Sequence, residues 1–187
     1  MILDYIEKSY DKGEPIFLAE LPCTSKEALR QEMKALTDAG KLIRLYNGVY
    51  YKPYKTILGT EGKMSINKYI EKKYIYKNKS RCGYIRGLGL YNKYGFTTQI
   101  PSVIEVASNM ATTKQRKIDV DGYNIIVYKP LAEINEENIS EIEFLDLISD
   151  IDIYSEISFS KVKELLNRYP DKTYRNLYNC GLMKYLV

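Results

Sequence analysis

The sequence of 187 residues contains no histidine, so it lacks the side chain that most often acts as a general base near neutral pH. Nucleophiles activated by histidine are therefore excluded, and an enzyme built on this chain would have to use carboxylates or lysines. Cysteine is also scarce, because only Cys23, Cys82 and Cys180 occur and they are far apart. Without histidine they cannot form an ordinary zinc site or a disulfide framework, so we expect reduced cysteines.

Long apolar runs are absent as well. No stretch approaches the roughly 20 apolar residues that span a bilayer, and residues 1–14 are too acidic and too interrupted for a signal peptide. We therefore expect a cytoplasmic protein that has no membrane partner. The hydrophobic fraction of 45% nonetheless suffices for one or two small domains with cores of their own.

Charge is unevenly distributed along the chain. Lys and Arg exceed Asp and Glu by 1 in residues 1–55 and by 8 in residues 56–129, whereas residues 130–187 have an excess of 5 carboxylates. The basic middle segment suggests a polyanionic or acidic partner, and the acidic end could face a basic protein. Solvated surface charge is the alternative explanation for both segments.

A helix with clear ends is predicted for residues 25–39. Thr24 and Glu27 have the spacing of a capping box, and Gly40 is the kind of residue that ends a helix in the left-handed conformation. Apolar residues at helical spacing predict one packed face, and polar residues cluster on the other. The packed residues are Leu29, Met33 and Leu36. The residues available to a ligand are Lys26, Glu27, Arg30, Gln31 and Lys34.

A hairpin is predicted directly after this helix. Asn47-Gly48 separates two short runs of β-branched and aromatic residues, and this dipeptide favours a two-residue turn in which both residues have positive φ. Apolar residues lie on both faces of the hairpin, so the sequence leaves open which face is buried. Upstream, residues 2–10 read as an amphipathic helix, and residues 15–22 are long enough for one or two helical turns.

Helix, short helix, capped helix and hairpin together predict a winged helix-turn-helix in residues 1–55. The third helix would enter the major groove of DNA, and the hairpin would be the wing. Wing side chains usually lie along the phosphate backbone. The candidates for this role are Arg44, Tyr46, Asn47 and Lys52.

Residues 63–81 combine lysines with tyrosines, a composition that could bind single-stranded nucleic acid. Helical spacing of the apolar residues favours a different interpretation, in which they face the core and the lysines are solvated. These apolar residues are Ile66, Tyr69, Ile70 and Tyr74.

Further along the chain, the sequence predicts a glycine-containing helix that ends near Gly95 and a strand over residues 103–107. A second hairpin around Asp121-Gly122 would join strands at 115–120 and 123–129. Gly87 and Gly89 lack the context of a phosphate-binding loop and instead favour close helix packing.

Residues 134–187 read as three helices, with apolar positions such as Ile142, Val162 and Leu177 in successive helices. We therefore predict an α+β protein. Its N-terminal winged helix-turn-helix is followed by a mixed α/β domain over residues 56–187 that is basic in 56–129 and acidic and helical in 130–187.

Two segments resemble the AbiEi-like antitoxins, predicted transcriptional regulators of bacterial abortive-infection systems of the type IV toxin–antitoxin class. They are GKLIRLYNGVYYKP, after the capped helix, and GLGLYNKYGFTTQIPSVIEVASN, before a pair of strands. The resemblance covers roughly residues 1–130 and is most specific at residues 44–50 and 95–101. Tyr46-Asn47 stands where the family often has basic residues.

The resemblance implies a winged-helix domain that binds duplex DNA of its own promoter and represses transcription, joined to a second domain needed for antitoxin activity. The implied functional partner is a nucleotidyltransferase-like toxin, countered without a stable complex. No catalytic activity, metal or cofactor is implied.

Two alternatives stay open at this point. One is a winged helix that docks onto another protein and has no role on DNA. The other is a metal-dependent nuclease or nucleotidyltransferase in which Glu105, Asp119 and Asp121 bind the ion from neighbouring strands. The turn explains Asp121-Gly122 better than a metal site does, and no Glu-x-Lys pattern follows on the strand.

Overall fold

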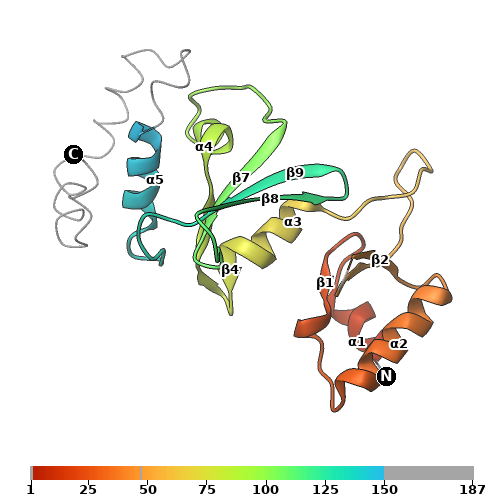
Figure 1. Ribbon diagram of the computed structural model, residues 1–187. Helices are drawn as coiled ribbons and strands as arrows, with labels where there is room; N and C mark the ends of the chain where they lie inside the picture. Colours follow the sequence, from red (N-terminus) through yellow and green to blue (C-terminus); the bar gives the residue numbers. More distant parts are fainter. Residues whose placement is uncertain (1, 47, 150–187) are drawn as a thin grey trace. The chain divides into compact units, whose positions relative to one another are not determined.

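The structure is a computed structural model that describes residues 2–46 and 48–149 (Figure 1). The chain forms two compact units, the first ending at Ile70 and the second beginning at Glu71. Each unit combines helices with a β-sheet, so the predicted mixed α+β class is confirmed. Within the described residues, no helix is long and apolar enough to cross a lipid bilayer.

The first unit contains three helices, a short 3₁₀ turn and a three-stranded sheet with the order β1-β3-β2. The elements are α1 (Ile2–Ser9), β1 (Ile16–Phe17), η1 (Leu18–Glu20), α2 (Lys26–Asp38), β2 (Ile43–Tyr46), β3 (Val49–Tyr51) and α3 (Ile66–Ile70). The helix predicted at residues 2–10 is therefore confirmed as α1, and the hairpin predicted at residues 41–53 as β2–β3.

The short helix predicted at residues 15–22 is wrong in its first half. Ile16 and Phe17 form strand β1, which pairs antiparallel with β3, and only the 3₁₀ turn that follows is helical. β-branched and aromatic side chains suit a strand, and β3 offers them an unpaired edge. The backbone N–H of Leu18 donates to the carbonyl of Gly48 at 2.8 Å and so anchors this segment to the hairpin turn.

Helix α2 begins one residue later than the capping box predicts. Ser25, in an extended conformation, is the N-cap, and its hydroxyl accepts a hydrogen bond from the N–H of Ala28 at 3.4 Å. Thr24 is not the cap. The C-terminus is as predicted, because Gly40 has a φ of 68° and the N–H of Lys41 donates to the carbonyl of Leu36 at 2.9 Å. This is the Schellman arrangement, which satisfies carbonyls left open at a helix end.

The hairpin packs on a core formed by α1, α2 and β1. Ile6, Ile16 and Met33 have no exposed surface there, and all three residues of β3 are buried. β2 is half exposed and contains a bulge between Arg44 and Tyr46. The bulge shifts the alternation of side chains by one residue, which is why the sequence pattern places apolar residues on both faces.

Residues 56–70 belong to the first unit, although the sequence prediction placed the domain boundary after residue 55. The N–H of Ser65 donates to the carbonyl of Gly13 at 2.8 Å, and the ring of Tyr69 lies 5.7 Å from that of Phe17. The apolar residues predicted from helical spacing to face a core are all buried. Ile66, Tyr69 and Ile70 belong to the first unit, and Tyr74 belongs to the second.

The second unit contains a four-stranded sheet with the order β6-β7-β9-β8. Up to residue 149, its elements are η2 (Glu71–Ile75, a π-helical turn), β4 (Tyr76–Lys77), β5 (Ser80–Arg81), β6 (Gly83–Ile85), α4 (Gly87–Lys93), β7 (Val103–Ser108), β8 (Gln115–Val120), β9 (Tyr123–Tyr128) and α5 (Ile139–Ser149). The predicted helix near Gly95, the strand at 103–107 and the second hairpin are confirmed. Strands β7 and β9 run parallel, and the other pairs are antiparallel.

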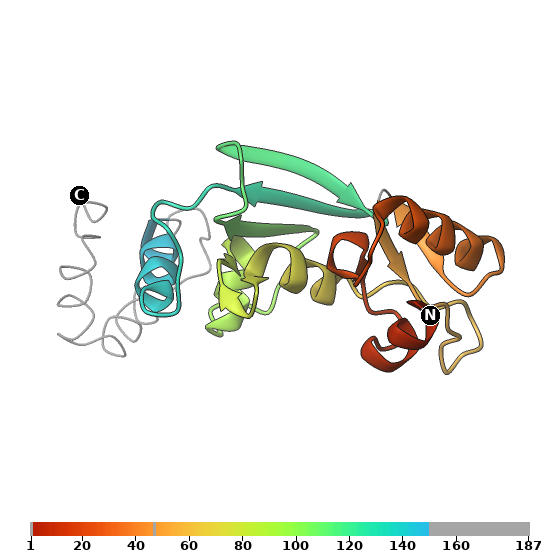
Figure 2. The same ribbon diagram turned by 90° about the horizontal axis from the view of Figure 1, so that it is seen from below.

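Helix α5 packs against α4, and α4 packs against β7 (Figure 1). Tyr84 of β6 and Ala107 of β7 join the core of these helices. β8 forms the outer edge of the sheet (Figure 2). Of the three helices predicted at the C-terminal end, α5 corresponds to the first. The other two lie outside the described residues.

Gly83 should be among the least replaceable residues of the second unit. A Cβ atom there would lie against the backbone carbonyl of Tyr74 and 2.7 Å from that of Ala107. Gly83→Ala should therefore lower the free energy of unfolding by about 2 kcal/mol or more, because backbone must shift.

Gly89→Ala is the matched control for this prediction. Its Cβ would meet only a methyl group of Ile85, at 2.6 Å, which can move, and alanine favours the helix by about 1 kcal/mol over glycine. Denaturant titration followed by circular dichroism gives both values. Equal stabilities of the two variants would contradict the predicted close approach of the backbone at Gly83.

Candidate nucleic-acid interface

Helix α2 contacts the rest of its unit through a narrow stripe. Leu29 and Met33 are buried, and Leu36 and Thr37 are half buried, whereas every other residue of the helix is exposed. The exposed residues include all five side chains predicted to be available to a ligand. Those residues are Lys26, Glu27, Arg30, Gln31 and Lys34.

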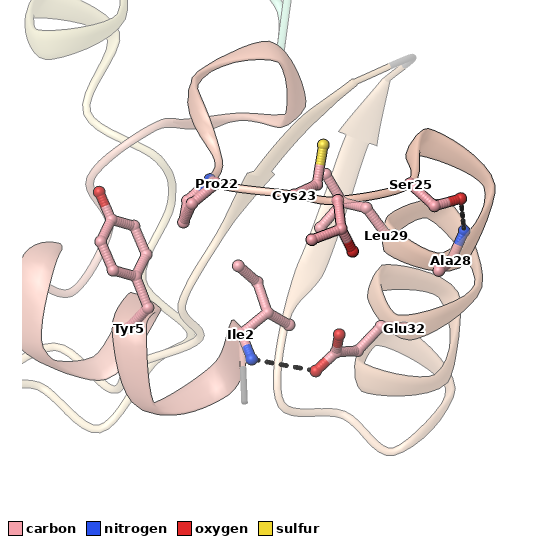
Figure 3. Close-up of a pocket in the computed structure, with 9 residues that line it drawn as sticks. Ile2, Tyr5, Pro22, Cys23, Ser25, Ala28, Leu29 and Glu32 are labelled. Carbon is pink, nitrogen blue, oxygen red and sulfur yellow. Dashed lines mark hydrogen bonds between the residues drawn. The ribbon is translucent and has the colours of Figure 1, made fainter.

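The three cations of α2 lie on the same flank of the helix. Lys26, Arg30 and Lys34 are each four residues apart, so each is turned by only about 40° from the last. Glu32 lies on the other flank, where its carboxylate accepts a hydrogen bond from the N–H of Ile2 in α1 at 3.1 Å (Figure 3). The cationic stripe, Lys26, Arg30 and Lys34, therefore faces away from α1.

The local ion pair on this stripe is weak. Arg30 lies 3.6 Å from the carboxylate of Glu27, and the two side chains are 63% and 81% exposed. Exposed pairs of this spacing contribute about 0.3–0.5 kcal/mol, and like charges four residues apart cost a similar amount. Arg30 can therefore leave Glu27 and bind a phosphate group with little loss of free energy.

A pocket of about 500 Å³ lies between α1 and the N-terminal end of α2 (Figure 3). It is lined by Ile2, Tyr5, Pro22, Cys23, Thr24, Ser25, Ala28, Leu29 and Glu32. The only charged side chain among these residues is a carboxylate, so the pocket does not suit a phosphate. The cations are on the opposite flank of the helix.

The predicted wing residues differ in how accessible they are. Arg44 is exposed on β2. Tyr46 is half buried, and its hydroxyl shares a hydrogen bond with that of Tyr69. Lys52 is half buried too, and its ammonium group donates to the carbonyl of Glu7 at 3.4 Å. Asn47 lies outside the described residues.

Three cations of the basic segment, Arg81, Arg86 and Lys93, pair with carboxylates of the second unit itself. Glu143 on α5 is only 4% exposed, and its carboxylate accepts hydrogen bonds from the ammonium group of Lys93 at 2.6 and 2.7 Å and from the hydroxyl of Tyr94 at 2.8 Å. The guanidinium of Arg81 lies 3.4 Å from the same carboxylate. We call these four residues the Glu143 cluster.

A second buried carboxylate on α5 repeats this arrangement. Arg86 donates to Asp146 at 2.7 Å, and its guanidinium lies 4.5 Å from the centre of the Tyr128 ring. Burial, and then the negative charge of Asp146, raise the pKa of the Tyr84 hydroxyl well above its usual value, so this tyrosine stays neutral. The acidic side chains of α5 are thus partners of the basic segment and do not form a solvated acidic surface.

Sequence reasoning missed these pairs, although a signal was present. Residues 130–149 contain six carboxylates and no lysine or arginine, next to a segment with a large basic excess. Opposite excesses in adjacent segments of one chain are typical of internal pairing as well as of external partners. Which side chains meet depends on how α5 packs against α4, and that is a tertiary contact.

The carboxylates considered for a metal site do not converge. Glu105 on β7 and Asp119 on β8 are separated by strand β9. Asp121 occupies the turn with a φ of 55°, and the carboxylate of Asp119 accepts a hydrogen bond from the N–H of Gly122 at 3.3 Å. Among the described residues, no group of three or more His, Cys, Asp or Glu side chains could hold a metal ion.

Neither a family model nor a curated protein matches the chain.

Substitution of the exposed polar residues of α2 should hardly change the free energy of unfolding. Arg30→Ala, Gln31→Ala and Lys34→Ala should each change the free energy of unfolding by less than about 0.5 kcal/mol, because the interactions lost are solvent-exposed. Met33→Ala, at a fully buried position of the same helix, should cost about 2–5 kcal/mol. Thermal unfolding of the four variants provides the comparison, and a large loss for Arg30→Ala would indicate a structural role.

Proposed function

We propose that the first unit binds duplex DNA as a winged helix-turn-helix, with α2 in the major groove and the β2–β3 hairpin as the wing. The observation that carries this proposal is the cationic stripe of Lys26, Arg30 and Lys34 on a helix that exposes most of its circumference. The order of α1, η1, α2 and hairpin is the order of such domains.

The side chains on α2 divide into two roles. Gln31 can pair bidentately with adenine and Arg30 with guanine, so these two residues are suited to reading bases. Lys26 and Lys34 offer point charges for phosphates, and Arg44 on β2 is the most exposed wing cation for the same purpose. Because residues 1–55 have a net charge of only +1, we expect modest non-specific affinity.

The biological role that we propose is that of a transcriptional autorepressor and antitoxin. It rests on the resemblance to AbiEi-like antitoxins at residues 44–50 and 95–101. In this proposal the first unit represses the protein's own promoter, and the second unit provides the antitoxin activity against a nucleotidyltransferase-like toxin. The protein itself carries out no catalysis.

A protein-docking winged helix is the second candidate, and one observation favours it. Tyr46 and Lys52, two of the four predicted wing contacts, already make hydrogen bonds within the first unit. Such a wing has fewer side chains available to contact the phosphate backbone. The hydrogen bond from the Lys52 ammonium group to the carbonyl of Glu7 is long, at 3.4 Å, and a phosphate could replace the carbonyl as acceptor.

Binding to duplex DNA from the protein's own promoter region should depend on α2 in a specific way. Gln31→Ala and Arg30→Ala should narrow the difference in affinity between promoter and random duplex by about 1–3 kcal/mol each. Lys34→Ala should weaken both duplexes about equally and reduce the slope of log K against log salt by roughly 1.

Lys8→Ala removes an exposed cation from α1 and is the charge-matched control for Lys34→Ala. It should leave the affinity nearly unchanged. Fluorescence anisotropy across several salt concentrations gives these quantities. Absence of any preference for promoter DNA in the wild-type protein, or full preference in both α2 variants, would contradict this assignment and favour the docking alternative.

The two proposed roles should be separable by mutation. An Arg30→Ala and Gln31→Ala double variant should lose repression of a promoter reporter but still rescue growth when the proposed nucleotidyltransferase-like toxin is co-expressed. Rescue should instead fail when Glu143→Ala disrupts the α4–α5 packing, since removing one partner from a buried ion pair costs about 3–5 kcal/mol. Loss of rescue in the α2 variant alone would contradict a division of labour between the units.

A further inference from the structure

Strand β8 is an edge of the four-stranded sheet, and it is exposed along most of its length (Figure 2). The N–H of Lys129 donates to the carbonyl of Lys114 at 3.1 Å, which identifies these two residues as a hydrogen-bonded pair between the β8 and β9 segments. In an antiparallel ladder such pairs alternate with non-bonded ones. The N–H and C=O groups of Lys117 and Asp119 therefore point outward from the edge of the sheet.

The side chains of Lys117 and Asp119 lie on one face of the sheet, because they are two residues apart on a strand. Both are exposed. They help to line a hollow of about 370 Å³ on this face together with Val103, Asn124 and Ile126. The outward backbone groups and the alternating charges thus occupy the same short stretch of β8.

We propose that β8 pairs antiparallel with β8 of a second copy of this chain, so that two four-stranded sheets join into one. In this register Lys117 lies opposite Asp119 of the second copy, and by two-fold symmetry Asp119 lies opposite the second copy's Lys117. The outward N–H and C=O groups of both residues then form the hydrogen bonds of the new ladder. The two Ile118 side chains face each other across the axis.

Charge selects this register over its neighbours. A shift of the pairing by two residues in one direction places Lys117 opposite Lys117 of the second copy. The same shift in the other direction places Asp119 opposite Asp119 of the second copy. Like charges directly opposite are destabilising in sheets, whereas opposite charges stabilise. A shift of one residue would turn the apolar face of one sheet toward solvent. Of these three registers, only the proposed one places both Lys117 and Asp119 opposite charges of the other sign.

Lysine on an edge strand is usually a device that prevents pairing with other chains. Here the charges alternate in sign at a spacing of two residues, so the edge opposes most foreign strands but complements itself. The hollows of the two copies become adjacent across the axis. This dimer does not depend on DNA binding. If the proposed function is correct, however, two α2 helices per dimer lead us to expect a pseudo-palindromic promoter site.

Sedimentation velocity of the full chain over a wide range of concentrations tests the dimer. We expect a monomer–dimer equilibrium for the wild type. Lys117→Asp should weaken dimerisation about tenfold or more, because two attractive pairs become repulsive. Adding Asp119→Lys in the same chain should restore it, since the double swap recreates opposite charges at both pairs.

Lys117→Pro tests the backbone contribution independently of charge repulsion. Proline removes an N–H that points outward, so the ladder to β9 keeps its hydrogen bonds while pairing with a second copy is lost. Lys79→Asp, the same change of charge in the β4–β5 turn, is the control and should not alter the equilibrium. Thermal unfolding verifies that each variant is folded.

A protein that stays monomeric at every concentration would overturn the proposal. So would a dimer that withstands both Lys117→Asp and Lys117→Pro, because it would use another surface. Failure of the double swap to restore a dimer lost in the folded Lys117→Asp variant would overturn the register. None of these outcomes would affect the DNA-binding proposal, which is tested separately through α2.

Discussion

The burial of the Glu143 carboxylate is the constraint on which the second unit depends. A carboxylate with only 4% of its side chain exposed is stable only if donors surround it, and Lys93, Tyr94 and Arg81 supply them. Lys93 ends α4, Tyr94 is the C-cap of that helix and Arg81 belongs to β5, so the carboxylate fixes how α5 lies against α4 and β5. The arrangement also accounts for the sequence after the basic segment, because every charged side chain in residues 130–149 is a carboxylate.

Internal neutralisation changes how the charge of the whole chain should be interpreted. The excess of positive charge in residues 56–129 is the most prominent electrostatic feature of the sequence, yet Arg81, Arg86 and Lys93 point to carboxylates of the same unit. The first unit has almost no net charge, but its α2 helix concentrates three cations on one flank. The proposed nucleic-acid interface is therefore supported by the position of the cations on α2 and not by the net charge of the first unit.

Local patterns in the sequence predicted most elements correctly, because helix ends and hairpin turns depend on a few neighbouring residues. Gly40, Gly48 and Asp121-Gly122 all adopt the backbone conformations that their positions require. β1 was missed because two residues carry too little periodicity, and only the edge of β3 makes them a strand. The exposed face of α2 followed from periodicity alone. The Glu143 cluster could not be predicted, since its members come from separate segments that meet only through packing.

Hydrogen–deuterium exchange of the full chain, with and without a duplex of its promoter, distinguishes DNA binding through α2 from binding through the basic segment. We expect DNA to slow exchange in α2 and in the β2–β3 hairpin and to leave exchange in the described strands and helices of the second unit unchanged. Slower exchange confined to the basic segment from Glu71 to Lys129, with α2 unaffected, would contradict DNA binding through α2.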